Sequence, residues 1–547
     1  MPLFALRSDR DLGIGDTQAA REMVDWCARH KISLLQLLPI NETGDDNSPY
    51  NAISSMALDP TTIAVSPDTL PELSKKTFQE LAPDSLLKEL RAGSVQYRKV
   101  KPLKLRLLRE AFNGFKKQLE DKTSERARRF LEFLKKNDHW VSDYALFRTL
   151  MELHDNLPLW EQWPETYRDP DGARAWLLER PEAERRRFSE TIQFYSYVQW
   201  VAREQWLELK AYAGAQGVAL MGDIPFGIGR YSADVWGNRS LFDLYWSCGA
   251  PPETFFKPDL FTERWGQNWG IPLYRWNRMR EDNHHWWRAR IKGTSEIFHA
   301  FRIDHVLGFY RVYAFPWKPE DNHLYLHLTP EQARGRSGDL PRFFPNDDKD
   351  GHSRWLNQEH GEALLKMVLD AGGPTVVVAE DLGMVPDYVR PSLLQLGISG
   401  FKIPIFEREK DGSYKKAEEY PSLSIATLAT HDHEPVAALW QRWTLEKSAE
   451  AQHLLNWIGW KGEAPQIFTS ELHAAICRKL LSCPSWLVIF MITDLFGQIQ
   501  RFNVPGPMSD SNWTERLSCT IAQWDQNPEI GSKVETVQKL ILGSGRK

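Results

Sequence analysis

Short apolar runs that recur along the whole chain constrain its fold more than any other feature. Each run has the length of a strand, most are continuous rather than alternating, and each ends in or next to a polar or acidic residue. Continuous apolar strands are typical of parallel sheets buried on both faces. Helical patterns separate them, so the sequence predicts an α/β fold, a (β/α)8 TIM barrel with inserted helical subdomains. The eight runs are 34–40, 61–65, 218–224, 298–304, 375–380, 399–406, 425–432 and 486–494.

The second and third runs lie far apart, and the sequence between them has a different character. It is rich in charge and has helical spacing, with Leu105, Leu108, Phe112 and Phe115 on one apolar face. Acidic residues are mixed through its basic ones, which is typical of a solvated helix surface. We therefore predict the first part of a catalytic barrel over 1–69, a mainly helical inserted subdomain over 70–188, and the rest of the barrel with loop insertions over 189–547.

Composition narrows the class of partner. Lys and Arg total 68 and Asp and Glu total 73, a net charge of −5, so we expect neither nucleic acid nor an anionic membrane as a partner. The first residues lack the apolar core of a signal peptide, and no apolar stretch approaches the ~20 residues of a membrane span. The five cysteines form no C-x-x-C pair, which favours a reducing cytoplasm.

Four acids stand at the ends of predicted strands: Asp223, Asp304, Glu380 and Asp432. One such acid is usually a turn or helix-capping residue, but four at one end of a barrel indicate a site. Such a ring serves either as a metal site of the enolase type or as the carboxylate pair of glycoside chemistry. Arg302 stands two residues before Asp304 and therefore on the same face of its strand. A cation there keeps a carboxylate ionised and competes with a metal, which favours glycoside chemistry.

The sequence also carries motifs that resemble a known family. RIDH (302–305), AEDLG (379–383) and THD (430–432) are similar to regions of the α-amylase clan. The segments 48–60, 222–227, 249–255, 266–274 and 503–507 narrow the resemblance to glycoside hydrolase family 77, the amylomaltases or disproportionating enzymes. The similarity runs from Leu6 to about Leu517. RIDHVLGFYR and YSADVW resemble the plant cytosolic branch of the family, and we expect no starch-binding modules here.

The resemblance implies a 4-alpha-glucanotransferase that cuts an α-1,4-glucan and passes a segment to the 4-hydroxyl of another sugar. Asp304 matches the nucleophile, Glu380 the general acid/base and Asp432 the third carboxylate. The expected partners are maltooligosaccharides, maltose and glycogen or starch-derived glucan, and no cofactor or metal is implied. The supporting residues implied by the match are Arg302, His305, His431 and Asp223, and the substrate-contacting ones are Ser48, Tyr50, Gln267, Trp269 and Asn503. Glu253 and Thr254 replace a tyrosine of many relatives, and we expect Phe255 to take over part of its contact.

Three alternatives stay open at this point. A hydrolase could use the same carboxylates, and a glucan-binding protein could keep the barrel without activity. A metal-dependent barrel is the third. Trp269 and Tyr50 are also open to interpretation as packing aromatics, and Asn503 as a turn residue.

Overall fold

The structure is a computed structural model that describes residues 1–121, 123–253, 258–505 and 511–546. Within them, parallel strands form two sheets in the orders β1-β2-β5-β8 and β9-β10-β11. A parallel bridge between Val378 and Ser399 joins the sheets, so the strands follow one another as in a barrel. The strands are β1 (Leu34–Gln36), β2 (Ala219–Ile224), β5 (Ala300–Ile303), β8 (Val376–Ala379), β9 (Gly400–Lys402), β10 (Ser424–Thr427) and β11 (Leu487–Ile489).

Seven of the eight predicted runs overlap one of these strands, and the run 61–65 does not. Its first residues form a 3-10 helix, Pro60–Thr62, in which the Asp59 carboxylate accepts the N–H of Thr61 at 2.8 Å. Proline favours the first helical position, so Asp59 and Pro60 together start a turn rather than a strand. Ile63 and Val65 are buried all the same. The prediction was therefore wrong, because continuous apolar residues report burial and not conformation.

Met1 flanks β1 instead of that run. Its amino group donates to the carbonyl of Gln36 at 2.7 Å, and the Leu38 N–H donates to the carbonyl of Met1 at 3.1 Å. The Leu37 N–H between them donates to Met221 on β2. Successive backbone groups of a strand point to opposite sides, so Met1 lies on the side of β1 away from β2.

Helices cover the strands on the outside. Among the described residues α1 packs on β1, α7 on β2, α11 on β5 and α15 on β8. Their side chains join the barrel in one apolar core that includes Trp26, Trp206 and Trp287. The helices of the barrel and its loops are α1 (Thr17–Arg29), α8 (Ala233–Gly237), α9 (Leu260–Trp265), α10 (Trp276–Glu281), α11 (His285–Ile297), α12 (Leu307–Tyr310), α13 (Asn322–Tyr325), α14 (Pro330–Ser337), α15 (Gly351–Gly372), α16 (Val389–Gln395), α17 (Val436–Leu445), α18 (Ala449–Ile458), α19 (Ser470–Leu481), α20 (Ile492–Leu495) and α21 (Pro528–Gly543).

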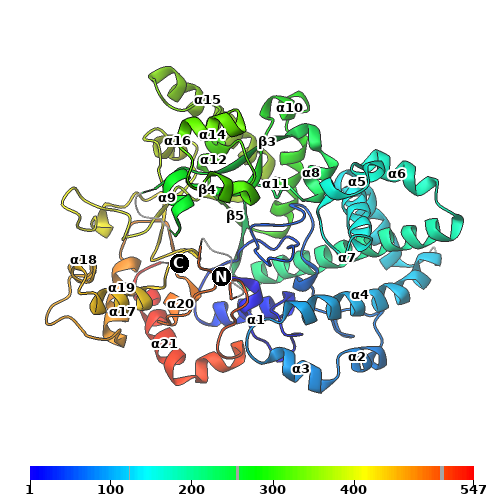
Figure 1. Cartoon of the computed structure of the whole chain (residues 1–547). Coiled ribbons are helices and arrows are strands. Elements are labelled where there is room, and N and C mark those ends of the chain that lie inside the picture. Colours follow the sequence, from blue (N-terminus) through cyan, green and yellow to red (C-terminus); the bar gives the residue numbers. More distant parts are fainter. Residues whose placement is uncertain (122, 254–257, 506–510, 547) are drawn as a thin grey trace.

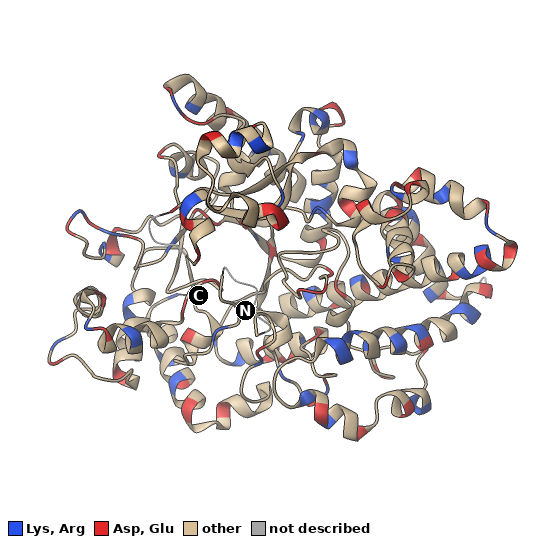
Figure 2. Cartoon of the chain, viewed as in Figure 1, with Lys and Arg blue, Asp and Glu red and all other residues tan. Residues whose placement is uncertain are grey.

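The segment after β1 forms helices at one side of the molecule, of which α4, α5 and α7 are long (Figure 1). They are α2 (Lys75–Leu81), α3 (Asp84–Arg91), α4 (Tyr97–Glu120), α5 (Glu125–Glu152), α6 (Pro170–Leu178) and α7 (Glu182–Ala215). The apolar face read from the sequence packs inward, since Leu108, Phe112 and Phe115 are buried. Residues of both charges are spread along these helices, as Figure 2 shows.

A four-stranded antiparallel sheet in the described part of the chain was not predicted. Its order is β4-β3-β6-β7, with β3 (Phe242–Ala250), β4 (Gln267–Tyr274), β6 (Val312–Phe315) and β7 (Arg342–Phe344). Gly249 on β3 pairs with Asn268 on β4. A Cβ atom at Gly249 would lie 1.8 Å from the carbonyl oxygen of Gln267, so only glycine allows the two strands to meet here.

Candidate active site

Asp304, Glu380 and Asp432 come from the carboxyl ends of three barrel strands. Asp304 directly follows β5 and Glu380 directly follows β8, and Asp432 lies in the loop after β10. The Glu380 N–H donates to the carbonyl of Ile303 at 2.9 Å, which ties the ends of β5 and β8 together. All three acids line one cleft with a volume of about 3140 Å³. The barrel thus brings together carboxylates that are up to 128 residues apart (432−304).

Arg302 holds two of the carboxylates in place. Its guanidinium is 2.6 Å from Asp304 and 2.5 Å from Asp223, which lies on β2. Arg302 is buried, with 3% of its surface exposed, and the Asp223 side chain is fully covered. Burial raises the pKa of Asp223, and the charge of Arg302 opposes that rise. The arginine therefore holds the Asp304 carboxylate in place, and Asp304 still lines the cleft.

Glu380 is held by backbone donors on both oxygens. The N–H of His305 donates to one oxygen at 2.8 Å, and the N–H of Leu382 donates to the other at 2.9 Å. His305 adopts a left-handed backbone conformation with φ of 49°, which is uncommon outside glycine. Desolvation and then the charge of Asp304 raise the pKa of Glu380 to about 7, against the pull of Arg302. Glu380 can therefore be protonated at neutral pH.

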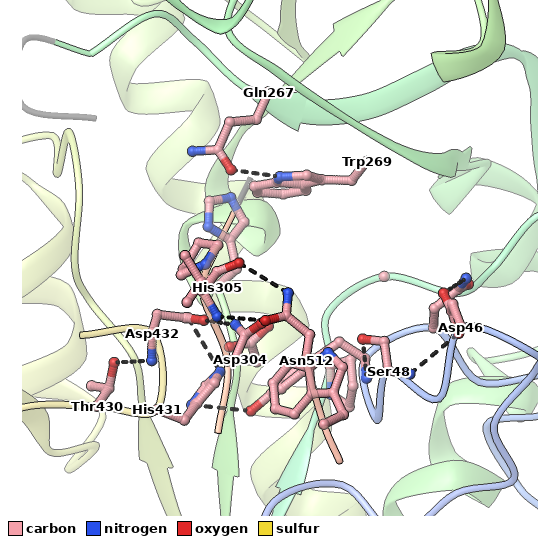
Figure 3. Close-up of a pocket in the computed structure, with 18 of the residues that line it drawn as sticks. Asp46, Ser48, Gln267, Trp269, Asp304, His305, Thr430, His431, Asp432 and Asn512 are labelled. Carbon is pink, nitrogen blue, oxygen red and sulfur yellow. Dashed lines mark hydrogen bonds and ion pairs between the residues drawn. The ribbon is translucent and has the colours of Figure 1, made fainter. Parts of the chain in front are cut away.

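Asp432 is surrounded by donors. Asn503 donates to one carboxylate oxygen at 2.8 Å. His431 lies 3.2 Å from the other oxygen, as Figure 3 shows. Desolvation acts to raise the pKa of Asp432, but the charge and hydrogen bond of His431 outweigh it and hold that pKa below its usual range. The Arg501 side chain donates to the Asp432 carbonyl at 2.9 Å. Asp432 is therefore a fixed negative charge in the cleft.

Tyr50 and His431 form one wall of the cleft. Their rings stack 4.8 Å apart at 11°, and the Tyr50 hydroxyl donates to Asp223 at 2.7 Å. Ser48 shares the Tyr50 loop, and its hydroxyl accepts the Tyr50 N–H at 3.4 Å. These contacts make Tyr50 part of the site and not a packing residue elsewhere in the core.

The antiparallel sheet supplies the opposite side of the cleft. Gln267 and Trp269 lie on β4, and the Trp269 indole donates to the Gln267 side chain at 3.1 Å. The Trp269 ring meets His305 edge to face at 4.9 Å (Figure 3). Burial lowers the pKa of His305 to about 4, so this imidazole is neutral at pH 7. All predicted site residues thus line one cleft except Asp223, which lies directly behind it, and Phe255, which lies outside the described residues.

The sequence analysis missed Trp513 and Asn512. The Trp513 ring lies 6.1 Å from both Tyr50 and His431 and has a left-handed backbone with φ of 63°. The Asn512 side chain bonds the N–H and the carbonyl of Val504, each at 3.0 Å. It therefore pins the segment after Asn503. Neither residue belongs to a strand-end pattern, and only their position near the end of the family resemblance could have drawn attention to them.

The described residues contain no group of three or more His, Cys, Asp or Glu side chains placed to hold a metal ion. No helix in the described parts of the chain has the length and apolar character needed to cross a membrane. All five cysteines lie among the described residues and are free.

Comparison with known proteins identifies the family of this chain. The family model described as 4-alpha-glucanotransferase, glycoside hydrolase family 77, matches residues 1–521. A 4-alpha-glucanotransferase of Chlamydia pneumoniae is 30% identical over 98% of this chain and 94% of that protein. The rice 4-alpha-glucanotransferase DPE2 is 24% identical over the whole chain and 69% of its own length. The solved amylomaltase of Streptococcus agalactiae in complex with acarbose is 23% identical, covers 100% of this chain and 98% of that one, and has a TM-score of 0.77, which confirms the barrel fold. The chain therefore belongs to glycoside hydrolase family 77 and is a 4-alpha-glucanotransferase, as the resemblance predicts.

Proposed function

We propose that Asp304, Glu380 and Asp432 transfer α-1,4-glucan segments by a retaining double displacement. The Asp304 carboxylate attacks the anomeric carbon while Glu380 donates its proton to the glycosidic oxygen that leaves. A covalent β-glycosyl enzyme results. Glu380, now a carboxylate, takes the proton of an acceptor 4-hydroxyl, whose oxygen attacks the same carbon and releases Asp304. The two inversions leave the α configuration unchanged.

One observation carries this assignment: two carboxyl groups of the same cleft lie in different surroundings, one beside a guanidinium and one buried with a raised pKa. Asp304 is ion-paired with Arg302, and the pKa of Glu380 is raised to about 7. A retaining enzyme needs one ionised nucleophile and one protonated acid at the same pH. Burial raises the pKa of Glu380 and so supplies the acid, and the ion pair with Arg302 holds the Asp304 carboxylate in place for attack.

Asp432 has the features of a transition-state stabiliser. Its pKa is held low, so it carries a full negative charge opposite the positive charge that develops at the anomeric carbon. His431 and Asn503 orient this charge, and we assign to them a supporting role. We assign binding or positioning of sugar hydroxyls and rings to Arg302, Asp223, His305, Ser48, Tyr50, Gln267 and Trp269, and include Phe255 on the resemblance alone.

The substrates follow from the family, which acts on alpha-glucans. We propose maltooligosaccharides, maltose and glycogen or starch-derived glucan as donors and acceptors, in the cytoplasm. Transfer instead of hydrolysis requires that a bound acceptor sugar exclude water from the glycosyl enzyme. Stacked Tyr50 and His431 on one side and Trp269 on the other are suited to cover sugar faces in that way. We also retain the division into barrel (1–69 and 189–547) and helical insertion (70–188) as a proposal.

Incubation with maltotriose, without added metal and with EDTA, tests the proposal. We expect a ladder of longer maltooligosaccharides together with glucose or maltose. Maltose and glucose alone would establish hydrolysis, and no reaction would favour a binding protein. Asp304→Asn should abolish transfer.

A matched control is Asp381→Asn. Asp381 is the next residue after Glu380, is buried, and bonds the Phe401 N–H at 2.6 Å and Arg390 at 2.9 Å. Asp381 is not among the described residues that line the cleft, so its variant should keep transfer activity. Full activity of Asp304→Asn would contradict the assignment of the nucleophile.

A further inference from the structure

Asp494 is a buried carboxylate that the proposed mechanism does not use. It lies in α20, the short helix that follows β11. β11 is the parallel neighbour of β10, with Leu487 opposite Ile425. Asp494 and Asp432 therefore extend from the carboxyl ends of adjacent strands. The Asp494 side chain has no exposed surface.

One oxygen of Asp494 caps the helix that follows Asp432. It accepts the N–H of Val436, the first residue of α17, at 2.7 Å. The N–H groups of a first helical turn have no partner inside the helix. Pro435, which precedes Val436, provides no capping side chain. Asp494 takes over that role from the neighbouring strand.

The chain between Asp432 and this cap is short and stiff. The His433 N–H donates to the Thr430 carbonyl at 3.0 Å, and the side chains of the same two residues meet at 2.7 Å. Pro435 then restricts the backbone before Val436. Only residues 433–435 separate Asp432 from Val436, so a displacement of Val436 would also shift Asp432.

The segment that carries Asp494 also contacts Asp432 directly. Arg501 donates to the Asp432 carbonyl and Asn503 donates to its carboxylate, at 2.9 and 2.8 Å. Among the described residues, the stretch from Asp494 to Asn503 thus holds the Asp432 loop at its backbone, at its side chain and, through Val436, at its end. At the end of the loop, the hydrogen bond from Val436 to Asp494 adds to the ion pair between Glu434 and Arg442 at 2.8 Å.

The surroundings of Asp494 indicate that this residue does more than fill space in the core. Its second oxygen is buried and has no hydrogen-bond partner among the described residues, and the His473 ring bonds its carbonyl at 2.8 Å. A buried carboxyl group that is half satisfied costs stability, which an apolar residue would not. Burial raises the pKa of Asp494 to about 7, and the Val436 N–H opposes that rise. The contact that Asp494 makes with Val436 therefore needs an acceptor oxygen and does not need a negative charge.

We propose that Asp494 is a positioning residue for Asp432, acting through its hydrogen bond to the Val436 N–H at the start of α17. This inference rests on the proposed role of Asp432 in the transition state. Because only an acceptor is required, asparagine in place of Asp494 keeps the function and alanine removes it.

The experiment compares Asp494→Asn with Asp494→Ala and measures kcat and KM for maltotriose. For the alanine variant we expect kcat to fall about 10- to 100-fold, since small displacements of a catalytic group have effects of this size. KM should change less than about threefold, because Asp432 acts in the transition state. The asparagine variant should stay within about threefold of the unchanged enzyme in both constants. If the alanine variant is not recovered folded, Asp494→Val, which fills the same space without an acceptor, replaces it.

A double-mutant comparison distinguishes positioning from loss of structure. Both Asp494 substitutions are repeated in Asp432→Asn, with α-maltotriosyl fluoride as a donor that keeps the residual rate measurable. If Asp494 acts through Asp432, alanine causes no further loss there. The control is Asp169→Ala, which removes a cap that accepts the Gly172 N–H at 2.9 Å at the start of α6 and should lower the melting temperature without changing kcat.

Three outcomes would overturn the proposal while leaving the mechanism intact. They are an alanine variant with unchanged kcat, an asparagine variant as impaired as alanine, and losses that multiply in Asp432→Asn. Full activity of Asp432→Asn by itself would instead refute the role of Asp432 and, with it, the proposed function.

Discussion

The raised pKa of Glu380 predicts an alkaline limit to the glycosylation step. Burial, assisted by Asp304, places this pKa at about 7. At pH 6 about nine-tenths of the enzyme holds the proton and at pH 8 about one-tenth, so kcat/KM for maltotriose should fall about tenfold over this range. An ordinary glutamate would already have lost its proton near pH 4.5, and the activity with it.

The assay compares two donors that differ in their leaving groups. Maltotriose requires protonation of the leaving oxygen, whereas fluoride departs from α-maltotriosyl fluoride without it. The initial rate of fluoride release should therefore show no decline near pH 7. Glu380→Gln should largely retain fluoride release while losing transfer from maltotriose. An identical alkaline limb with both donors, or a limb near pH 4.5, would refute this assignment of the acid.

The same pKa has a consequence for stability. The folded-state pKa lies above the ordinary value of 4.5, so the folded protein binds the proton more tightly than the unfolded chain does. Stability therefore falls as pH rises from 4.5 to 7, by up to ~3 kcal/mol for a shift of this size. Glu380→Gln, which removes the ionisable group, should raise the melting temperature at pH 8 and leave it nearly unchanged at pH 4. A variant less stable than the parent at pH 8 would contradict this reasoning.

Three further substitutions test the arrangement around the carboxylates. Arg302→Met leaves the covered Asp223 carboxylate without its cation, and the free energy of unfolding in urea should fall by about 3–5 kcal/mol. Asn503→Ala removes a hydrogen bond to the charged Asp432, so kcat should fall about tenfold or more with little change in KM. Tyr50→Phe keeps the ring stacked on its neighbour but loses the hydroxyl that donates to Asp223, and kcat/KM should fall about fivefold to tenfold.

Each of these three substitutions has a control or an outcome that would contradict the prediction. Lys539→Met, which removes the cation of an exposed pair with Glu535, should leave unfolding unchanged, and an equal loss there would deny Arg302 any special role. Asn503→Asp should be as damaging as alanine, because it places a second charge beside Asp432; normal activity would show that the contact is dispensable. For Tyr50, a phenylalanine variant equal to the parent would assign the residue to stacking alone.

The carboxylates could be located from sequence because local rules determine their positions. A buried parallel strand is read from a continuous apolar run, and its carboxyl end faces the site in every barrel of this kind. Asp304 and Glu380 directly follow such strands. The pairing of Arg302 with Asp304 follows likewise from the two-residue period of a strand.

The sequence did not predict the conformation of segments that depends on residues outside the segment. The run 61–65 resembles the other predicted strands in its apolar residues. Asp59 caps its first turn and Pro60 is the first helical residue, so the segment begins as a 3-10 helix. The antiparallel sheet depends on pairing between β3, β4, β6 and β7, which span residues 242–344. Register between separate strands depends on the packing of the whole sheet and not on the periodicity within one strand.

The sequence by itself therefore predicted the α/β barrel, the helical pattern of the segment after the first strand and the acids at the strand ends, because apolar periodicity and strand length are properties of short segments. Only the tertiary structure determined the raised pKa of Glu380 and which residues form the walls of the cleft. The pKa of Glu380 depends on burial by residues from other strands, and Trp513 reaches Tyr50 across more than 460 positions (513−50 = 463). The hold of Asp494 on the Asp432 loop likewise joins the ends of two strands. Desolvation and hydrogen bonding depend on distance in space, which spacing along the chain does not specify.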